Sequence, residues 1–177
     1  MTFNLKTFEE CLAKEVGERK ARTFMSRFGP EPSGGAVKSS YYKALMDALS
    51  KEFPDYVGER ALMCHGRRCL GKTVAERARK LFQQSKDLEE FVGKLNAEGL
   101  AGGRLMYSEG KITGYYDRCY CGAVSKTSEP FGPTYCNCSR GWLLELFEAA
   151  IGRKCDVRFH QTVIQGGRQC DFEITLK

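Results

Sequence analysis

The sequence predicts an α+β fold, in which helices come first and an antiparallel sheet with one packed helix follows. Apolar residues recur at helical spacing early in the chain, beginning with Leu5, Phe8 and Leu12. After residue 103 the pattern changes to short alternating runs bounded by turn residues. Helices followed by hairpins around a single helix are typical of α+β proteins.

The helical region is predicted to cover residues 1–100. One helix is expected over 5–28, where Gly29-Pro30 ends it, and a second runs through Tyr41 and Leu49 and ends before Pro54. Shorter helices are predicted at about 56–66, 73–84 and 87–97. The Gly- and Ala-rich stretch 96–103 then indicates a hinge.

The α+β domain is predicted to cover residues 101–177. A first hairpin spans 104–118 with its turn at Glu109-Gly110. An amphipathic helix follows at 141–151. A second hairpin is expected from strands at 157–164 and 170–176, joined by a turn at Gly166-Gly167.

Composition excludes some classes of function. The chain has 177 residues, of which 42% are hydrophobic, enough to bury a core. Its formal net charge is +6, but Lys and Arg alternate with Glu and Asp along the predicted helices. That arrangement is typical of solvated helix faces, and we do not expect a nucleic-acid partner.

The sequence predicts neither a secretory signal nor a membrane-spanning segment. The first residues include Glu9 and Glu10 and lack the apolar stretch of a secretory signal. No run of about 18 apolar residues predicts a membrane span. Nine cysteines without such a signal favour a reducing, cytoplasmic location, where a patterned cysteine cluster more often binds metal or acts chemically.

Two Cys-x-Cys pairs are the strongest functional signal. Cys119 and Cys121 form the first pair, and Cys136 and Cys138 form the second. Four thiolates favour one tetrahedral zinc ion, with an iron–sulfur cluster as the alternative. Cys64 and Cys69 are possible additional ligands. Redox or disulfide chemistry and simple packing of small buried side chains stay open as other interpretations.

Residues 66–73 match the G-x-x-x-x-G-K-[ST] pattern of phosphate-binding loops, with Lys72 as the lysine. A true phosphate loop follows a buried strand, whereas the residues before Gly66 favour a helix. The match nevertheless leaves an ATP-binding protein as one alternative.

Catalytic residues are not identified by any motif. The two histidines are His65, beside Cys64, and His160, within a predicted strand. For an enzyme, Cys64 or Cys69 would be the reactive thiol.

Aromatic residues gather in the second half of the chain, where they form either core or the wall of an apolar pocket. The pocket candidates are Tyr116, Tyr135, Trp142, Phe147 and Phe159, with Cys170.

Residues 139–174 carry a glycine at a helix start (Gly141), another at its end (Gly152), a Gly166-Gly167 turn and a final strand that begins Cys170-Asp171-Phe172. This order resembles the C-terminal half of the 4-vinyl reductase-type ligand-binding domain. The tail is also similar to L-2-amino-thiazoline-4-carboxylic acid hydrolase-like proteins. The resemblance implies an α+β domain, often a homodimer, that binds a small molecule between its helices and its sheet.

The resemblance also implies a zinc site in aromatic-sensing relatives, but only Cys170 of that ligand set is present here. Phe159 and Thr162 occupy the other two places. The sequence therefore predicts a small-molecule or metal-binding sensor or accessory protein with a Cys-rich zinc site. The alternatives are an enzyme of the hydrolase-like or thiol-redox type and an ATP-binding protein.

Overall fold

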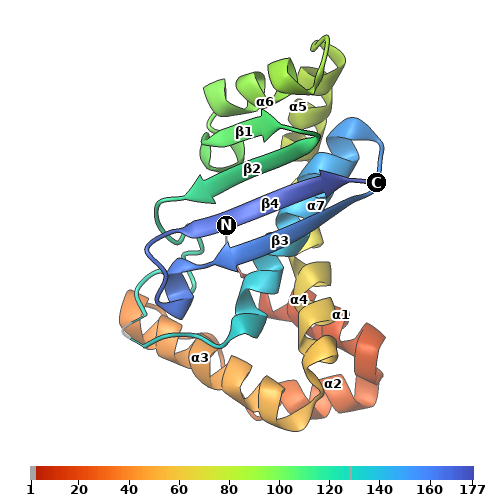
Figure 1. Cartoon of the computed structure of the whole chain (residues 1–177). Coiled ribbons are helices and arrows are strands. Elements are labelled where there is room, and N and C mark those ends of the chain that lie inside the picture. The colour runs from red at the N-terminus through yellow and green to blue at the C-terminus, as the bar shows by residue number, and fades with distance from the viewer. Residues whose placement is uncertain (1–2, 128) are drawn as a thin grey trace.

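A computed structural model of the protein describes residues 3–127 and 129–177. It confirms the α+β class, with a four-stranded antiparallel sheet between two groups of helices (Figure 1). The helices are α1 (Leu5–Val16), α2 (Glu18–Met25), α3 (Gly35–Glu52), α4 (Asp55–Cys69), α5 (Lys72–Gln83), α6 (Leu88–Ala97) and α7 (Asn137–Ile151). The strands are β1 (Leu105–Ser108), β2 (Lys111–Tyr116), β3 (Cys155–Gln161) and β4 (Cys170–Leu176).

The sheet has the strand order β1-β2-β4-β3. The two hairpins meet where β2 pairs with β4, which places Tyr116 opposite Cys170 and Gly114 opposite Phe172. Alternate residues of β4, including Phe172 and Ile174, are buried, as the period of a half-buried strand requires. Helix α7 crosses behind the sheet, and α5 and α6 lie at its β1 end (Figure 1).

Two predicted elements differ from the observed ones. The expected helix over 5–28 is two helices, because Gly17 has φ 88° and ψ 150°, a backbone conformation that interrupts a helix. The second hairpin has no tight turn at Gly166-Gly167, because β3 ends at Gln161 and a 3₁₀ turn, Val163–Gln165, leads into the connection to β4.

Helices α4 and α7 cross closely because each has a glycine at the crossing. A Cβ atom on Gly66 would lie 1.9 Å from the backbone oxygen of Cys138, and a Cβ atom on Gly141 would lie 2.1 Å from that of Met63. These two positions therefore require glycine for steric reasons. The crossing places the end of α4 beside the start of α7 (Figure 1).

The buried side chains form two hydrophobic cores. The first core lies between helices α1, α2, α3 and α4 and the segment that follows β2, and it includes Phe8, Phe24 and Tyr135. The second lies between α5, α6, α7 and the sheet, and includes Phe91, Phe147 and Phe172. The predicted division at residues 100 and 101 stays a prediction.

Among the described residues, none of the helices combines the length and apolar character that crossing a membrane requires.

Candidate functional site

Cysteines from three parts of the chain surround one small cavity of about 20 Å³. Cys119 and Cys121 come from the segment after β2, Cys136 immediately precedes α7, and Cys170 begins β4. The pairing of β2 with β4 and the return of the chain to α7 bring these thiols together. A cavity of this size holds about one atom of the size of a water molecule.

Cys138 does not line this cavity, although it is two residues from Cys136. It lines a neighbouring cavity of about 10 Å³ with His65, Cys69 and Cys121. The backbone is already helical at Cys136, so the side chains of Cys136 and Cys138 point about 200° apart around the helix axis. The spacing that would aim two sulfurs at one point in an extended strand separates them here.

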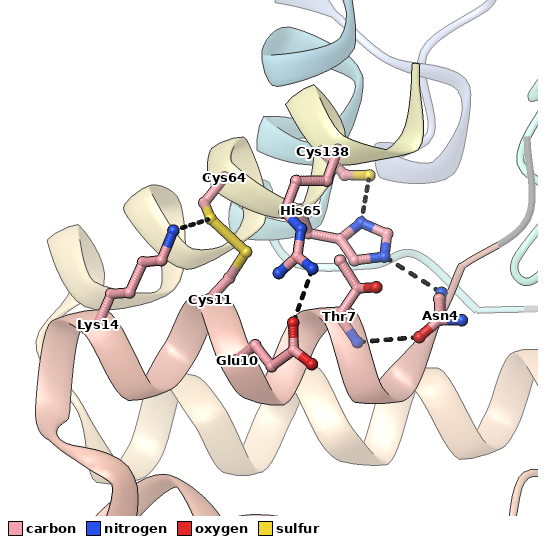
Figure 2. The surroundings of a disulfide bond; sticks show 9 residues. Asn4, Thr7, Glu10, Cys11, Lys14, Cys64, His65 and Cys138 are labelled. Carbon is pink, nitrogen blue, oxygen red and sulfur yellow. Dashed lines mark hydrogen bonds and ion pairs between the residues drawn. A yellow bond between two sulfur atoms is a disulfide. The ribbon is translucent and has the colours of Figure 1, made fainter. Parts of the chain in front are cut away.

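His65 links the cysteines to the N-terminal segment (Figure 2). Its Nδ1 atom lies 3.3 Å from Cys138 Sγ, and its Nε2 atom accepts a hydrogen bond from the Asn4 N–H at 3.1 Å. This network assigns the imidazole proton to Nδ1, facing the sulfur. The ring is buried, and burial lowers the pKa of His65 to about 4, so the imidazole is neutral at pH 7.

The thiols of the cluster are weak acids. Burial raises the pKa of Cys119 to about 11 and that of Cys136 to about 12, and it raises the pKa of Cys138 well above its ordinary value. These thiols are therefore protonated at neutral pH unless a cation favours the thiolate. A low-pKa catalytic thiolate is not what this environment produces.

The side chains do not converge on a metal position. Across residues 3–127 and 129–177, no group of three or more His, Cys, Asp or Glu side chains is placed to hold a metal ion. The structure thus brings Cys119, Cys121 and Cys136 to one cavity without forming the predicted tetrahedral site, and metal binding stays a prediction.

Cys64 is not available as a metal ligand or as a reactive thiol, because it forms a disulfide with Cys11 (Figure 2). This corrects the expectation for Cys64. The sequence patterns missed Cys11, because this cysteine belongs to no motif. The one sign of its burial is its position next to Leu12 on the apolar face of α1. Cys69 lies at the end of α4 and lines the cavity of His65 and Cys138.

The structure also corrects the expectation of a phosphate-binding loop at residues 66–73. Residues 66–69 are the last turn of α4, and Lys72 begins α5. Backbone N–H groups in that turn are bonded within the helix, so they cannot cradle a phosphate. Gly66 is present because α7 crosses there, which accounts for one glycine of the motif.

Four of the six predicted pocket residues, Tyr116, Tyr135, Phe159 and Cys170, line the thiol cavity of about 20 Å³. Tyr116 and Trp142 line an apolar pocket of about 240 Å³ with Tyr120, Val74 and Leu100. Tyr135 and Phe147 are core residues, one in each core. Phe159 lines a separate, more polar cleft of about 350 Å³ on the side of β3. Cys170 lies in the thiol-lined cavity, and His160 is exposed on β3.

Solved structures with a similar fold are distant in sequence. An H-NOX domain from Shewanella oneidensis, determined by NMR as the H103G mutant in the Fe(II)CO ligation state, has a TM-score of 0.51 at 13% identity, covering 97% of this chain and 96% of that chain. A crystal structure of an H-NOX protein from S. oneidensis in the Fe(II)NO ligation state has a TM-score of 0.49 at 11% identity, with the same two coverages. At this identity the likeness extends to the α+β fold alone.

A trafficking protein particle complex subunit 3 from Naegleria fowleri, covalently bound to palmitic acid, has a TM-score of 0.49 at 12% identity and covers 78% of this chain and 92% of that chain. The resemblance to 4-vinyl reductase and hydrolase-like proteins stays a prediction. No curated protein matches the chain. Residues 10–177 match a family of unknown function, DUF6144, and the chain belongs to that family.

Proposed function

We propose that this protein binds a thiophilic metal ion, most simply zinc, in its thiol cluster. The thiol cluster is the group of cysteines around the cavity of about 20 Å³. Cys119, Cys121 and Cys136 would be ligands, and Cys138 or Cys170 would be the fourth. The observation that carries the proposal is the cavity of about 20 Å³, which is of the size of one atom and is lined by four thiols. Zinc is the default ion for four sulfur ligands.

The separation of the sulfurs does not exclude this assembly. Cys119, Cys121, Cys136 and Cys170 already line one cavity, and rotation about one side-chain torsion changes where each sulfur points. Burial raises the pKa of Cys119 and of Cys136, so a bound metal must displace their protons, and binding should weaken as the pH falls. An iron–sulfur cluster is the alternative occupant.

The test is the metal content of protein purified anaerobically without a chelating resin, with an absorption spectrum. We expect about one zinc per chain and no visible colour. Cys136→Ser should lose the metal and melt at a lower temperature. Cys155→Ser is the matched control, because Cys155 is a buried thiol of the second core and should keep the metal when changed.

Iron and sulfide with visible absorption would identify the cluster alternative. Metal-free wild-type protein, or undiminished metal in Cys136→Ser, would contradict the proposal. Comparison of Cys138→Ser with Cys170→Ser then identifies the fourth ligand.

A second candidate function is the binding of a small apolar molecule in the pocket of about 240 Å³ beside Trp142. Aromatic and aliphatic side chains dominate its wall, which is typical of small-molecule sites. The H-NOX domain of similar fold was determined in an Fe(II)CO ligation state, and a binding role is compatible with this fold.

Trp142 is the single tryptophan of the chain, so its emission reports directly on this pocket. Benzene or cyclohexanol should change the emission saturably. Val74→Phe, which fills the pocket, should abolish the response. Val37→Phe makes the same change at an exposed position on α3 and should leave the response intact. A response that is linear in concentration, or unaffected by Val74→Phe, would count against this site.

A further inference from the structure

The Cys11–Cys64 disulfide cross-links α1 to α4, and Cys64 immediately precedes His65, whose ring contacts Cys138. The two cysteines are 53 positions apart in sequence, and their Cα atoms are 5.8 Å apart. Cys11 is completely buried, whereas Cys64 is partly exposed. Of the two cysteines, Cys64 is therefore the one that is open to solution.

A positive charge lies next to that sulfur. Lys14 Nζ, one turn after Cys11 on α1, is 4.0 Å from Cys64 Sγ (Figure 2). An ammonium group at this distance favours the thiolate form of a cysteine and makes it a better leaving group. The position of Lys14 thus favours release of Cys64 from a mixed disulfide.

Phe3 and Asn4, which precede α1, cover His65, the residue that follows Cys64. The Asn4 N–H donates to His65 Nε2 at 3.1 Å, and the Phe3 ring stacks on His65 with the ring centroids 4.1 Å apart. Phe3 also lines the cavity that contains Cys138. Phe3 and Asn4 thus form a cover over the His65–Cys138 pair, and the disulfide ties α1, the helix that follows them, to α4.

We propose that Cys11–Cys64 is a redox-active disulfide, reduced by a protein dithiol, and that its reduction loosens the cover over His65 and Cys138. A thiolate of the dithiol attacks Cys64 Sγ, the S–S bond breaks, and Cys11 leaves with the electron pair and takes a proton. The second thiol of the dithiol then attacks its partner sulfur in the mixed disulfide and releases Cys64 as a thiolate beside Lys14. The dithiol becomes a disulfide, and the chain gains two electrons and one proton, which Cys11 takes up. Cys64 stays a thiolate, and the proton of the second thiol passes to solvent.

This proposal is independent of metal binding, and thiol mapping tests it. Metal-free full-length protein is labelled with iodoacetamide before and after equilibration with dithiothreitol, and each cysteine is quantified by peptide mass spectrometry. Without reductant, we expect no label on Cys11 or Cys64. After reduction, Cys64 should label, and labelling of Cys138 should rise several-fold although Cys138 is in no disulfide. Cys155, a buried thiol of the second core, is the internal control and should not change.

Two variants sharpen the test. Cys11→Ser should give the high Cys138 labelling without any reductant. Lys14→Gln should slow the labelling of reduced Cys64 several-fold near neutral pH, whereas Lys6→Gln on the same helix should not. Label on Cys64 before reduction, or unchanged labelling of Cys138 after it, would overturn the proposal. An equal rise at Cys155 would also overturn it, because the whole chain would then have opened.

Discussion

At the scale of single residues, the side-chain amide of Asn96 hydrogen-bonds the backbone of a strand residue, as a neighbouring strand would. Asn96, near the end of α6, accepts a hydrogen bond from the Leu105 N–H and donates one to the Leu105 carbonyl, both at 2.8 Å. The amide therefore pairs with the first residue of β1 as a neighbouring strand would. This contact attaches the sheet edge to the helical part of the second core.

Replacement of Asn96 tests this contact. Asn96→Ala should lower the free energy of unfolding by about 2 kcal/mol, since two part-buried backbone groups lose their partner. Urea unfolding measures the loss, and hydrogen exchange should show faster exchange of the Leu105 amide. Asn137→Ala removes one similar bond, from Nδ2 to the Thr134 carbonyl, and should lose about half as much. Equal stability of Asn96→Ala and the wild type would contradict this account.

At the scale of elements, the crossing of α4 and α7 organises the molecule. It positions His65 against Cys138, and it depends on Gly66 and Gly141. A sequence pattern identifies a glycine but not the reason for it. Gly66 fitted a nucleotide motif by chance, whereas its physical role is to admit the backbone of another helix.

Alanine at these positions should be costly. Gly66→Ala and Gly141→Ala should each destabilise the protein by about 3 kcal/mol, because the new methyl group meets backbone atoms that cannot move aside. Gly93→Ala is the matched control. Gly93 is an exposed position of α6 with open space around it, so alanine there should stabilise by about 0.5–1 kcal/mol. Chemical denaturation of the three variants tests the contrast, and a neutral result at Gly66 would remove the steric explanation.

At the scale of the whole molecule, one carboxylate joins three elements. Glu148 on α7 accepts from Arg67 on α4 at 3.0 Å, from Lys154 at 3.1 Å and from the Cys155 N–H of β3 at 3.3 Å. Burial alone would raise the pKa of Glu148, but these partners outweigh it and hold the pKa below its ordinary value.

The lowered pKa predicts a dependence of stability on pH. The unfolded chain takes up the Glu148 proton at a higher pH than the folded protein does, so stability is full above the ordinary carboxyl pKa of 4.5. It is lost as the pH falls below that value and through the folded pKa. Glu148→Gln should be less stable at neutral pH and should lose less on acidification. Parallel acid profiles for the variant and the wild type, from urea midpoints, would contradict this role.

The elements that were predicted well depend on local patterns. The alternation in residues 170–176 and the Glu109-Gly110 turn identify their strands because side-chain direction and turn geometry are set by near neighbours. The helix over 5–28 was predicted as one piece because its apolar spacing continues across Gly17. The break depends on the positive φ of Gly17, a backbone conformation that the apolar spacing does not reveal.

The sequence by itself determined the α+β class and most element positions, because these follow from periodicity and from short motifs. Only the tertiary structure decided which thiols gather around one cavity and which way each thiol faces. Cys138 turns to His65 because the helix starts at that point, and Cys170 joins the cavity because β4 pairs with β2. The Cys11–Cys64 bond and the glycine crossing likewise depend on residues far apart in sequence, whose contacts no local pattern encodes.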